Sequence, residues 1–317
     1  MLSKDFPKSP VTDKNNVKLV DTFEVADIVK LYQEQENINV EKYFQHGETV
    51  YLLKCEDVGY RFYYPFEIAG DEEFYQSLQS EVTSKGEEYD RDWADDHKFA
   101  FEQIAPNSKV LEIGCNTGKF LERLLPKTQN VLGLEFNEKA ANIALEKGLN
   151  VKNESIEVHA EDNAGQYDVV CAFQVLEHVT QIKTFFEAAI KLLKPHGKLI
   201  LSVPNNEPFF QRFDRYCVLN LPPHHVGLWN FESFSNLCNV FEITVDKYYY
   251  SGTSSFWVDA FWRAKFFARI KTLPKQQTAF EKLKIISVAP FAVIGSIWDY
   301  FSGRSNHAHL TMVFSKK

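Results

Sequence analysis

The segment V-L-E-I-G-C-N-T-G-K-F at residues 110–120 decides the fold. Its first four residues predict a buried strand, and a helix is predicted from residue 119 to residue 125. The turn between them carries Gly114 and Gly118, which allow positive φ angles and close approach of a ligand. Because the first N–H groups of a helix have no partner within the helix, this turn predicts a ligand-binding site.

Strands and helices alternate on the carboxyl side of this segment. Further strands are predicted at residues 131–135, 150–152, 168–173 (continuing into 175–179), 198–203, 241–248 and 309–314, with helices at residues 139–147 and 184–193. Such alternation is typical of a parallel sheet covered by helices on both faces. The fold class predicted is therefore a doubly wound α/β sheet.

The acidic residue at the end of the first strand indicates which ligand the turn holds. A dinucleotide site requires G-x-G-x-x-G, and G-C-N-T-G-K-F lacks the middle and last glycines of that pattern. Glu112 would repel a pyrophosphate, whereas it would attract a ligand with a cationic amino group. The turn therefore favours S-adenosylmethionine (SAM) over NAD.

Three blocks of the chain resemble one family. E-x-G-x-x-x-G resembles motif I of the class I SAM-dependent methyltransferases. Y-D-V-V-C-A-F-Q-V-L-E-H-V at 167–179 resembles that family's fourth-strand motif, and L-L-K-P-H-G-K-L-I-L-S-V-P-N at 192–205 resembles its fifth strand. Asn116 and His196 replace glycines of the family pattern, and asparagine tolerates the left-handed backbone that glycine adopts.

The resemblance implies a Rossmann-like doubly wound sheet with an antiparallel last strand and SAM as the cofactor. It also implies that the carboxylate of Glu135, at the end of the second strand, holds the ribose hydroxyls. The residues expected to bind the cofactor are Glu112, Gly114, Cys115, Asn116, Gly118, Glu135, Phe136, Phe173 and Gln174.

Histidines are the candidate catalytic groups. A hydroxyl that accepts a methyl group loses a proton, and histidine is the usual base near neutral pH. His178 follows the fourth strand, at the sheet edge where open α/β folds bind ligands. His224 and His225 lie in L-P-P-H-H-V-G-L-W, which resembles PPHH segments on the acceptor side of bacterial relatives. Packing or capping roles are the alternatives, and the sequence spacing predicts no metal site.

Charge and cysteine usage narrow the partners and the compartment. A net charge of −8 argues against nucleic acid as the main partner. The five cysteines are scattered, without a C-x-x-C pair, which predicts neither a disulfide framework nor a zinc ribbon. Without an apolar leader segment, the expected location is the cytoplasm.

Two domains are expected. Residues 1–88 are predicted to form an N-terminal extension with a helix at 21–36 and short strands at 51–55 and 60–66, and residues 89–317 the methyltransferase domain. A helical insertion is expected at about 254–301, before the last strand. Its aromatic and basic residues favour packing over the sheet, with a homodimer contact or a membrane contact as alternatives.

The predicted function is methyl transfer from SAM, to an oxygen of a small molecule. The segment K-C-E-D-V-G-Y-R-F-Y-Y-P resembles a stretch of methyltransferases encoded among bacterial surface-polysaccharide genes, so a saccharide or sugar nucleotide is the expected acceptor. An NAD-dependent sugar-modifying enzyme and a non-catalytic SAM-binding protein are the alternatives.

Overall fold

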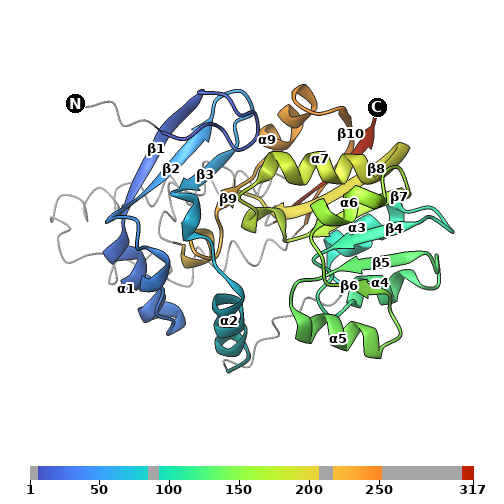
Figure 1. The fold of residues 1–317 in the computed structure, drawn as a ribbon, viewed down its shortest axis with the longest axis horizontal. Coiled ribbons are helices and arrows are strands. Elements are labelled where there is room, and N and C mark those ends of the chain that lie inside the picture. The colour runs from blue at the N-terminus through green and yellow to red at the C-terminus, as the bar shows by residue number, and fades with distance from the viewer. Residues whose placement is uncertain (1–5, 85–92, 207–216, 252–308) are drawn as a thin grey trace, which may run out of the picture. The chain divides into compact units, whose positions relative to one another are not determined.

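The computed structural model describes residues 6–84, 93–206, 217–251 and 309–317 (Figure 1). The chain divides into two compact units, one of Met1–Tyr249 with Leu310–Lys317 and one of Tyr250–His309. The second unit lies almost wholly outside the described residues, and so does the insertion expected at 254–301. In the described ranges no helix is long and apolar enough to cross a membrane.

A seven-stranded sheet forms the centre of the first unit, in the order β10-β11-β8-β7-β4-β5-β6. Its strands are β4 (Val110–Ile113), β5 (Val131–Leu134), β6 (Val151–Lys152), β7 (Tyr167–Phe173), β8 (Leu193–Pro204), β10 (Ile243–Ser251) and β11 (His309–Lys316). The pairs β4–β5, β4–β7, β5–β6 and β7–β8 are parallel. The α/β class and the Rossmann-like sheet predicted from the sequence are confirmed.

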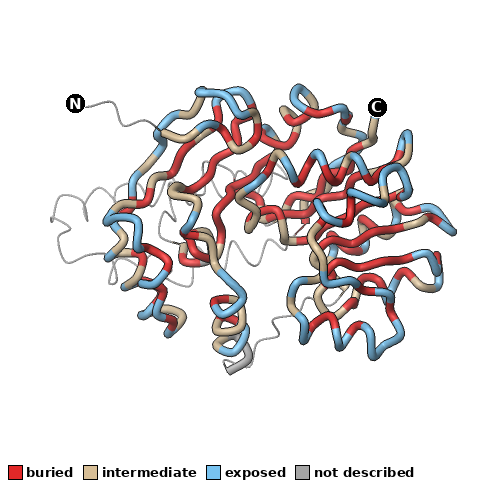
Figure 2. Tube along the Cα trace, in the orientation of Figure 1, coloured by how far each residue is buried: buried red, intermediate tan, exposed pale blue. Residues whose placement is uncertain are grey.

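Both faces of this sheet are buried, as the tube in Figure 2 shows. On one face, α3 (Asp95–Gln103), α4 (Lys119–Leu124) and α5 (Glu138–Glu146) share a single core with alternate strand residues such as Val110 and Cys171. The strand residues between them, such as Leu111, are buried as well. Helix α7 (Ile182–Leu192) contacts β7 and β8 and packs against α6 (Ile156–Asp162). Burial on both faces explains why the strands are continuous apolar runs.

A second sheet joins the N-terminal segment to the chain that follows β8. It has the order β1-β2-β3-β9, with β1 (Val17–Glu24), β2 (Thr49–Cys55), β3 (Arg61–Tyr64) and β9 (Gly227–Leu228). All of its pairings are antiparallel. One strand of this sheet thus comes from the methyltransferase domain predicted at 89–317, although the division at residue 88 stays a prediction.

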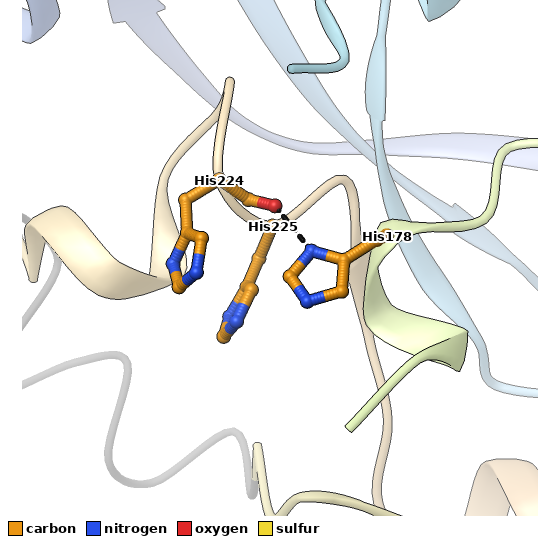
Figure 3. A group of neighbouring side chains, drawn as sticks. All are labelled: His178, His224 and His225. Atoms are coloured by element: carbon orange, nitrogen blue, oxygen red, sulfur yellow. Dashed lines mark hydrogen bonds between the residues drawn. The ribbon is translucent and has the colours of Figure 1, made fainter. Parts of the chain in front are cut away.

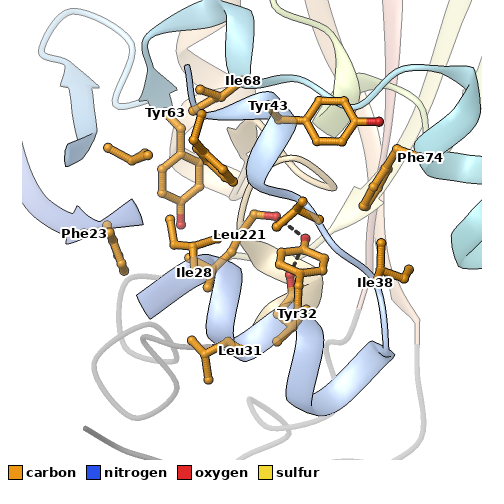
Figure 4. Packing of buried hydrophobic residues seen from close by; sticks show 14 of the residues in the cluster. Phe23, Ile28, Leu31, Tyr32, Ile38, Tyr43, Tyr63, Ile68, Phe74 and Leu221 are labelled. Atoms are coloured by element: carbon orange, nitrogen blue, oxygen red, sulfur yellow. Dashed lines mark hydrogen bonds between the residues drawn. The ribbon is translucent and has the colours of Figure 1, made fainter. Parts of the chain in front are cut away.

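An apolar cluster fixes the chain after β8 to the N-terminal segment (Figure 4). Helices α1 (Val25–Glu36) and α2 (Glu72–Ser84) contribute to it, together with Val218 and Leu221 near the short helix η4 (Val218–Asn220). The buried hydroxyl of Tyr32 lies 3.0 Å from the carbonyl oxygen of Val218 and 2.8 Å from that of Leu221. It also accepts the amide of His224 at 3.3 Å. The N-terminal segment therefore sets the position of the loop that carries His224.

Two local predictions were wrong, and one helix was missed. Residues 21–24, expected in a helix, belong to β1 because pairing with β2 determines their conformation, and α1 begins only at Val25. The extension of the fourth strand to 175–179 is a short 3-10 helix, η3 (Leu176–His178). Helix α6 was missed, although Ser155 caps it by accepting the amide of Val158.

Candidate active site

The glycine turn between β4 and α4 has left-handed backbone at three positions. The φ angle is 67° at Gly114, 48° at Asn116 and 77° at Gly118. Asn116 thus adopts the conformation expected when it replaces a family glycine. A Cβ at Gly114 would stand 2.6 Å from Cγ2 of Val175, and one at Gly118 would stand 2.3 Å from Cδ1 of Leu149. Both glycines are therefore required by protein packing, besides any approach of a ligand that they allow.

Hydrogen bonds of Glu135 link the glycine turn to the segment after β5. One carboxylate oxygen accepts the backbone amide of Asn116 at 2.8 Å, and the other accepts the backbone amide of Asn137 at 2.8 Å. The side chain is half-buried, and each oxygen has a second lone-pair direction for a hydroxyl. The next residue, Phe136, is 68% exposed, so its ring offers an apolar face beside the carboxylate.

Glu112 places a carboxylate inside the sheet beneath the turn. It is 4% exposed and lies in register with Gly133 on one side and Cys171 on the other. Gly133 leaves room for Cys115, whose Sγ would be 2.3 Å from a Cβ there. Burial and the nearby charge of Glu112 raise the pKa of both Cys115 and Cys171, so neither thiol is a nucleophile at neutral pH.

The residues at the end of β7 differ in what surrounds them. The ring of Phe173 is buried against His97 at 4.6 Å and Phe120 at 4.7 Å between centroids, within the core. Gln174 has a φ of 57°, and its side-chain amide donates to Ser202 Oγ at 3.3 Å. Strained non-glycine backbone of this kind concentrates at functional sites. That both residues bind the cofactor stays a prediction.

A buried acid missed by the sequence analysis supports Gln174. Ser202 Oγ donates to Asp96 Oδ2 at 2.8 Å, so the chain of hydrogen bonds runs from α3 through β8 to the residue after β7. Asp96 is fully buried and lies in the first turn of α3, where an acid is ordinary, so no local signal distinguishes it in the sequence.

The residues around the turn fit SAM. The buried carboxylate of Glu112 favours a cationic ligand group near the turn, the half-buried carboxylate of Glu135 suits hydroxyls, and the exposed ring of Phe136 suits an adenine face. The left-handed turn lets backbone approach the ligand closely.

Three histidines from two distant segments of the chain meet beyond the carboxyl end of β7 (Figure 3). His178 ends η3, and His224 and His225 follow η4. One ring nitrogen from each lies within 4.8 Å of those of the others. The ring centroids of His224 and His225 are 4.3 Å apart, and His178 lies 5.2 Å and 5.1 Å from them. All three candidate catalytic residues are therefore brought together, and we call them the histidine cluster.

Hydrogen bonds determine which ring nitrogen of His178 carries the proton. Its Nδ1 lies 2.7 Å from the carbonyl oxygen of His224 and 2.9 Å from the hydroxyl of Tyr75, which itself donates to that carbonyl at 3.1 Å. Because a carbonyl oxygen only accepts, Nδ1 carries the proton and Nε2 carries the lone pair. Burial lowers the pKa of His178 to about 4, so the ring is neutral at pH 7.

His225 is held in a similar way. Its Nδ1 lies 3.2 Å from Oδ1 of Asn220, an acceptor, so the neutral ring carries its lone pair on Nε2. Tyr75 and Asn220 were both missed from the sequence. Tyr75 is one aromatic among many on an ordinary helix, and Asn220 bears no motif, so no local signal distinguishes them.

Comparison with known proteins identifies the family. A family model described as "Methyltransferase domain" matches residues 86–246, about half of the chain. The chain belongs to the SAM-dependent methyltransferases. SAM is therefore its cofactor, as the glycine turn indicated. A crystal structure of a SAM-dependent methyltransferase from Archaeoglobus fulgidus is similar over 78% of this chain and all of that chain, with 14% identity and a TM-score of 0.45.

Curated relatives match a shorter stretch. A ubiquinone biosynthesis O-methyltransferase from Erwinia tasmaniensis is 37% identical over 103 residues, which is 31% of this chain and 42% of that protein. The protein of the same name from Acinetobacter baylyi is 31% identical over 123 residues, 37% of this chain and 50% of that protein. The chain thus matches half or less of these relatives' length.

Proposed function

We propose that this methyltransferase transfers the methyl group of SAM to a hydroxyl oxygen of a small molecule. The observation that carries the proposal is the histidine cluster beside the glycine turn. Val175 packs against Gly114 and lies three residues before His178. The segment after β7 therefore contacts the glycine turn and also contributes His178, at the sheet edge where such folds bind ligands. The O-methyltransferase names of the curated relatives support an oxygen acceptor.

Different residues of the chain bind the methyl donor and the acceptor. Glu112, Glu135 and the turn bind and orient the donor, which supplies a methyl group already activated by its positive sulfur. The histidine cluster contacts the acceptor hydroxyl and promotes loss of its proton at a ring nitrogen such as Nε2 of His178. Alignment of the two reactants supplies much of the rate enhancement.

The acceptor class is part of the proposal. The polysaccharide-type segment at 54–65 favours a saccharide or sugar nucleotide, whereas the relatives' names point to the acceptors of ubiquinone biosynthesis. Both classes carry hydroxyl groups. A non-catalytic SAM-binding protein is the competing function, and it requires no working acceptor site.

The test uses the full chain and labelled SAM. Sugar nucleotides and ubiquinone precursors are each incubated with the protein, and the products are analysed for a new O-methyl group. We expect transfer to one class and its loss in His178→Ala, with unchanged SAM affinity by calorimetry. SAM binding without transfer to any hydroxyl compound in either class would favour the non-catalytic alternative.

A further inference from the structure

The histidine cluster has a feature that a single proton-accepting base does not need. Three imidazoles from two segments place one nitrogen each within 4.8 Å, and they are not spread along a helix face or exposed at the surface. His225 is 6% exposed and the other two are half-buried. Three neutral imidazoles are the ligand set of several catalytic zinc sites.

The hydrogen bonds around the rings match those of metal ligands. Histidines that bind metals almost always donate the other ring N–H to a carbonyl or carboxylate, which fixes the tautomer. His178 donates from Nδ1 to the carbonyl oxygen of His224, and His225 donates from Nδ1 to Asn220 Oδ1. In both rings this donation leaves the proton on Nδ1, so the lone pair lies on Nε2. Among the described residues, none hydrogen-bonds to Nε2 of His178.

We propose that His178, His224 and His225 bind one divalent transition-metal ion such as Zn²⁺. A tetrahedral site with bonds of about 2.0–2.1 Å requires the three nitrogens to approach one another by roughly 1 Å. Rotation of the rings about their side-chain torsions supplies such a movement, while Pro222 and Pro223 restrict the backbone before the pair.

Three histidines leave a coordination position for a ligand from outside the chain. A hydroxyl oxygen suits that position, because a bound divalent cation lowers the pKa of a coordinated hydroxyl or water. This part of the inference rests on the proposed function, whereas metal binding itself does not. The proton of the hydroxyl would pass to solvent, and its oxygen would keep the electron pair that bonds to the methyl group as the carbon–sulfur bond breaks.

The experiment titrates the full chain, freed of metal with a chelator, with ZnCl₂ by calorimetry and with CoCl₂ by visible absorption. We expect one equivalent to bind, with cobalt bands of a nitrogen and oxygen environment. His178→Ala and His225→Ala should each weaken binding about 100-fold or more, because loss of a ligand exceeds the 10–100-fold effect of a supporting hydrogen bond.

Two matched controls separate the cluster from other donors. His196→Asn removes an exposed histidine and keeps a residue that tolerates its φ of 61°, so metal affinity should not change. Cys217→Ser tests the half-buried thiol nearest in sequence to the pair. Absence of binding, binding unchanged by both cluster variants, or a sulfur-to-cobalt band lost in Cys217→Ser would each overturn the proposal. SAM binding and methyl transfer are measured on the same samples, so failure of the metal site is distinct from failure of the proposed function.

Discussion

Two histidine environments in this chain, one buried and one half-buried, lie at opposite ends of the same strand. His159 of α6 is 2% exposed, and both its nitrogens are occupied: Nδ1 by Glu154 at 2.6 Å and Nε2 by the hydroxyl of Tyr167 at 2.7 Å. His178 has partners at Nδ1 alone among the described residues. A ring with two fixed partners joins elements of the fold, whereas a ring with one keeps a nitrogen for chemistry.

The location of the two rings agrees with this distinction. Tyr167 begins β7, so His159 lies at the amino end of the strand, whereas His178 lies just beyond the carboxyl end. Open parallel sheets bind ligands at their carboxyl ends. Aromatic neighbours are common to both sites, and the more buried ring is the one with two partners, so burial alone does not identify a functional histidine.

Replacing each histidine by alanine tests the comparison most severely. His178→Ala should lower turnover by about 10²–10⁴-fold with a small change in melting temperature, since it removes a group that contacts the acceptor. His159→Ala should leave the hydroxyl of Tyr167 without its hydrogen-bond partner and Glu154 with Lys152 alone, and should destabilise the fold by about 1–3 kcal/mol, while the folded fraction keeps its turnover. Turnover per folded molecule and thermal unfolding are measured for both. Equal turnover losses would remove the distinction.

Glu135→Ala should have the next largest effect, on the donor. The carboxylate organises the amides of Asn116 and Asn137 and is proposed to bind ribose hydroxyls, and charge-assisted hydrogen bonds contribute about 1.5–3 kcal/mol each at most. SAM affinity measured by calorimetry should fall about tenfold or more. Glu138→Ala, at an exposed site in the first turn of α5, is the control and should bind normally. Unchanged affinity in Glu135→Ala would move the ribose site elsewhere.

Gly114 refines the comparison of the two strand ends. It follows the carboxyl end of β4, where a ligand is expected, yet packing within the protein also constrains it. Gly114→Ala places a Cβ 2.6 Å from Val175 and imposes a positive φ, so we expect a loss of about 1–3 kcal/mol in the free energy of unfolding. Adding Val175→Ala should remove the part of this loss that comes from the steric clash. The part that comes from the positive φ of alanine should remain. Denaturant unfolding of the single and double variants measures both, and an additive double variant would contradict the predicted contact.

The smallest effect is expected from the supporting hydrogen bond of His225. Asn220→Ala removes the acceptor of Nδ1, which should weaken zinc affinity about tenfold and leave SAM affinity unchanged. Asn239→Ala, at an exposed site at the end of another short helix, η5 (Leu237–Asn239), serves as the comparison variant. Equal zinc affinity in the two variants would show that Asn220 does not orient His225.

The sequence by itself determined the α/β class, the glycine turn, the acidic residues Glu112 and Glu135 and the family. These signals are local: apolar periodicity marks a strand or helix, and a glycine or asparagine marks a left-handed turn. The same locality explains the errors, because pairing of β1 with β2 overrode the helical pattern at residues 21–24.

Only the tertiary structure decided how the candidate histidines combine. His178 and His224 are 46 residues apart, and they meet because β7 ends where the loop after β8 is held by Tyr32 of the N-terminal segment. No spacing rule for metal ligands applies to such a set, so the sequence predicted no metal site. Sequence periodicity records which face of an element is buried, whereas the partner of that face depends on contacts between segments that are distant along the chain.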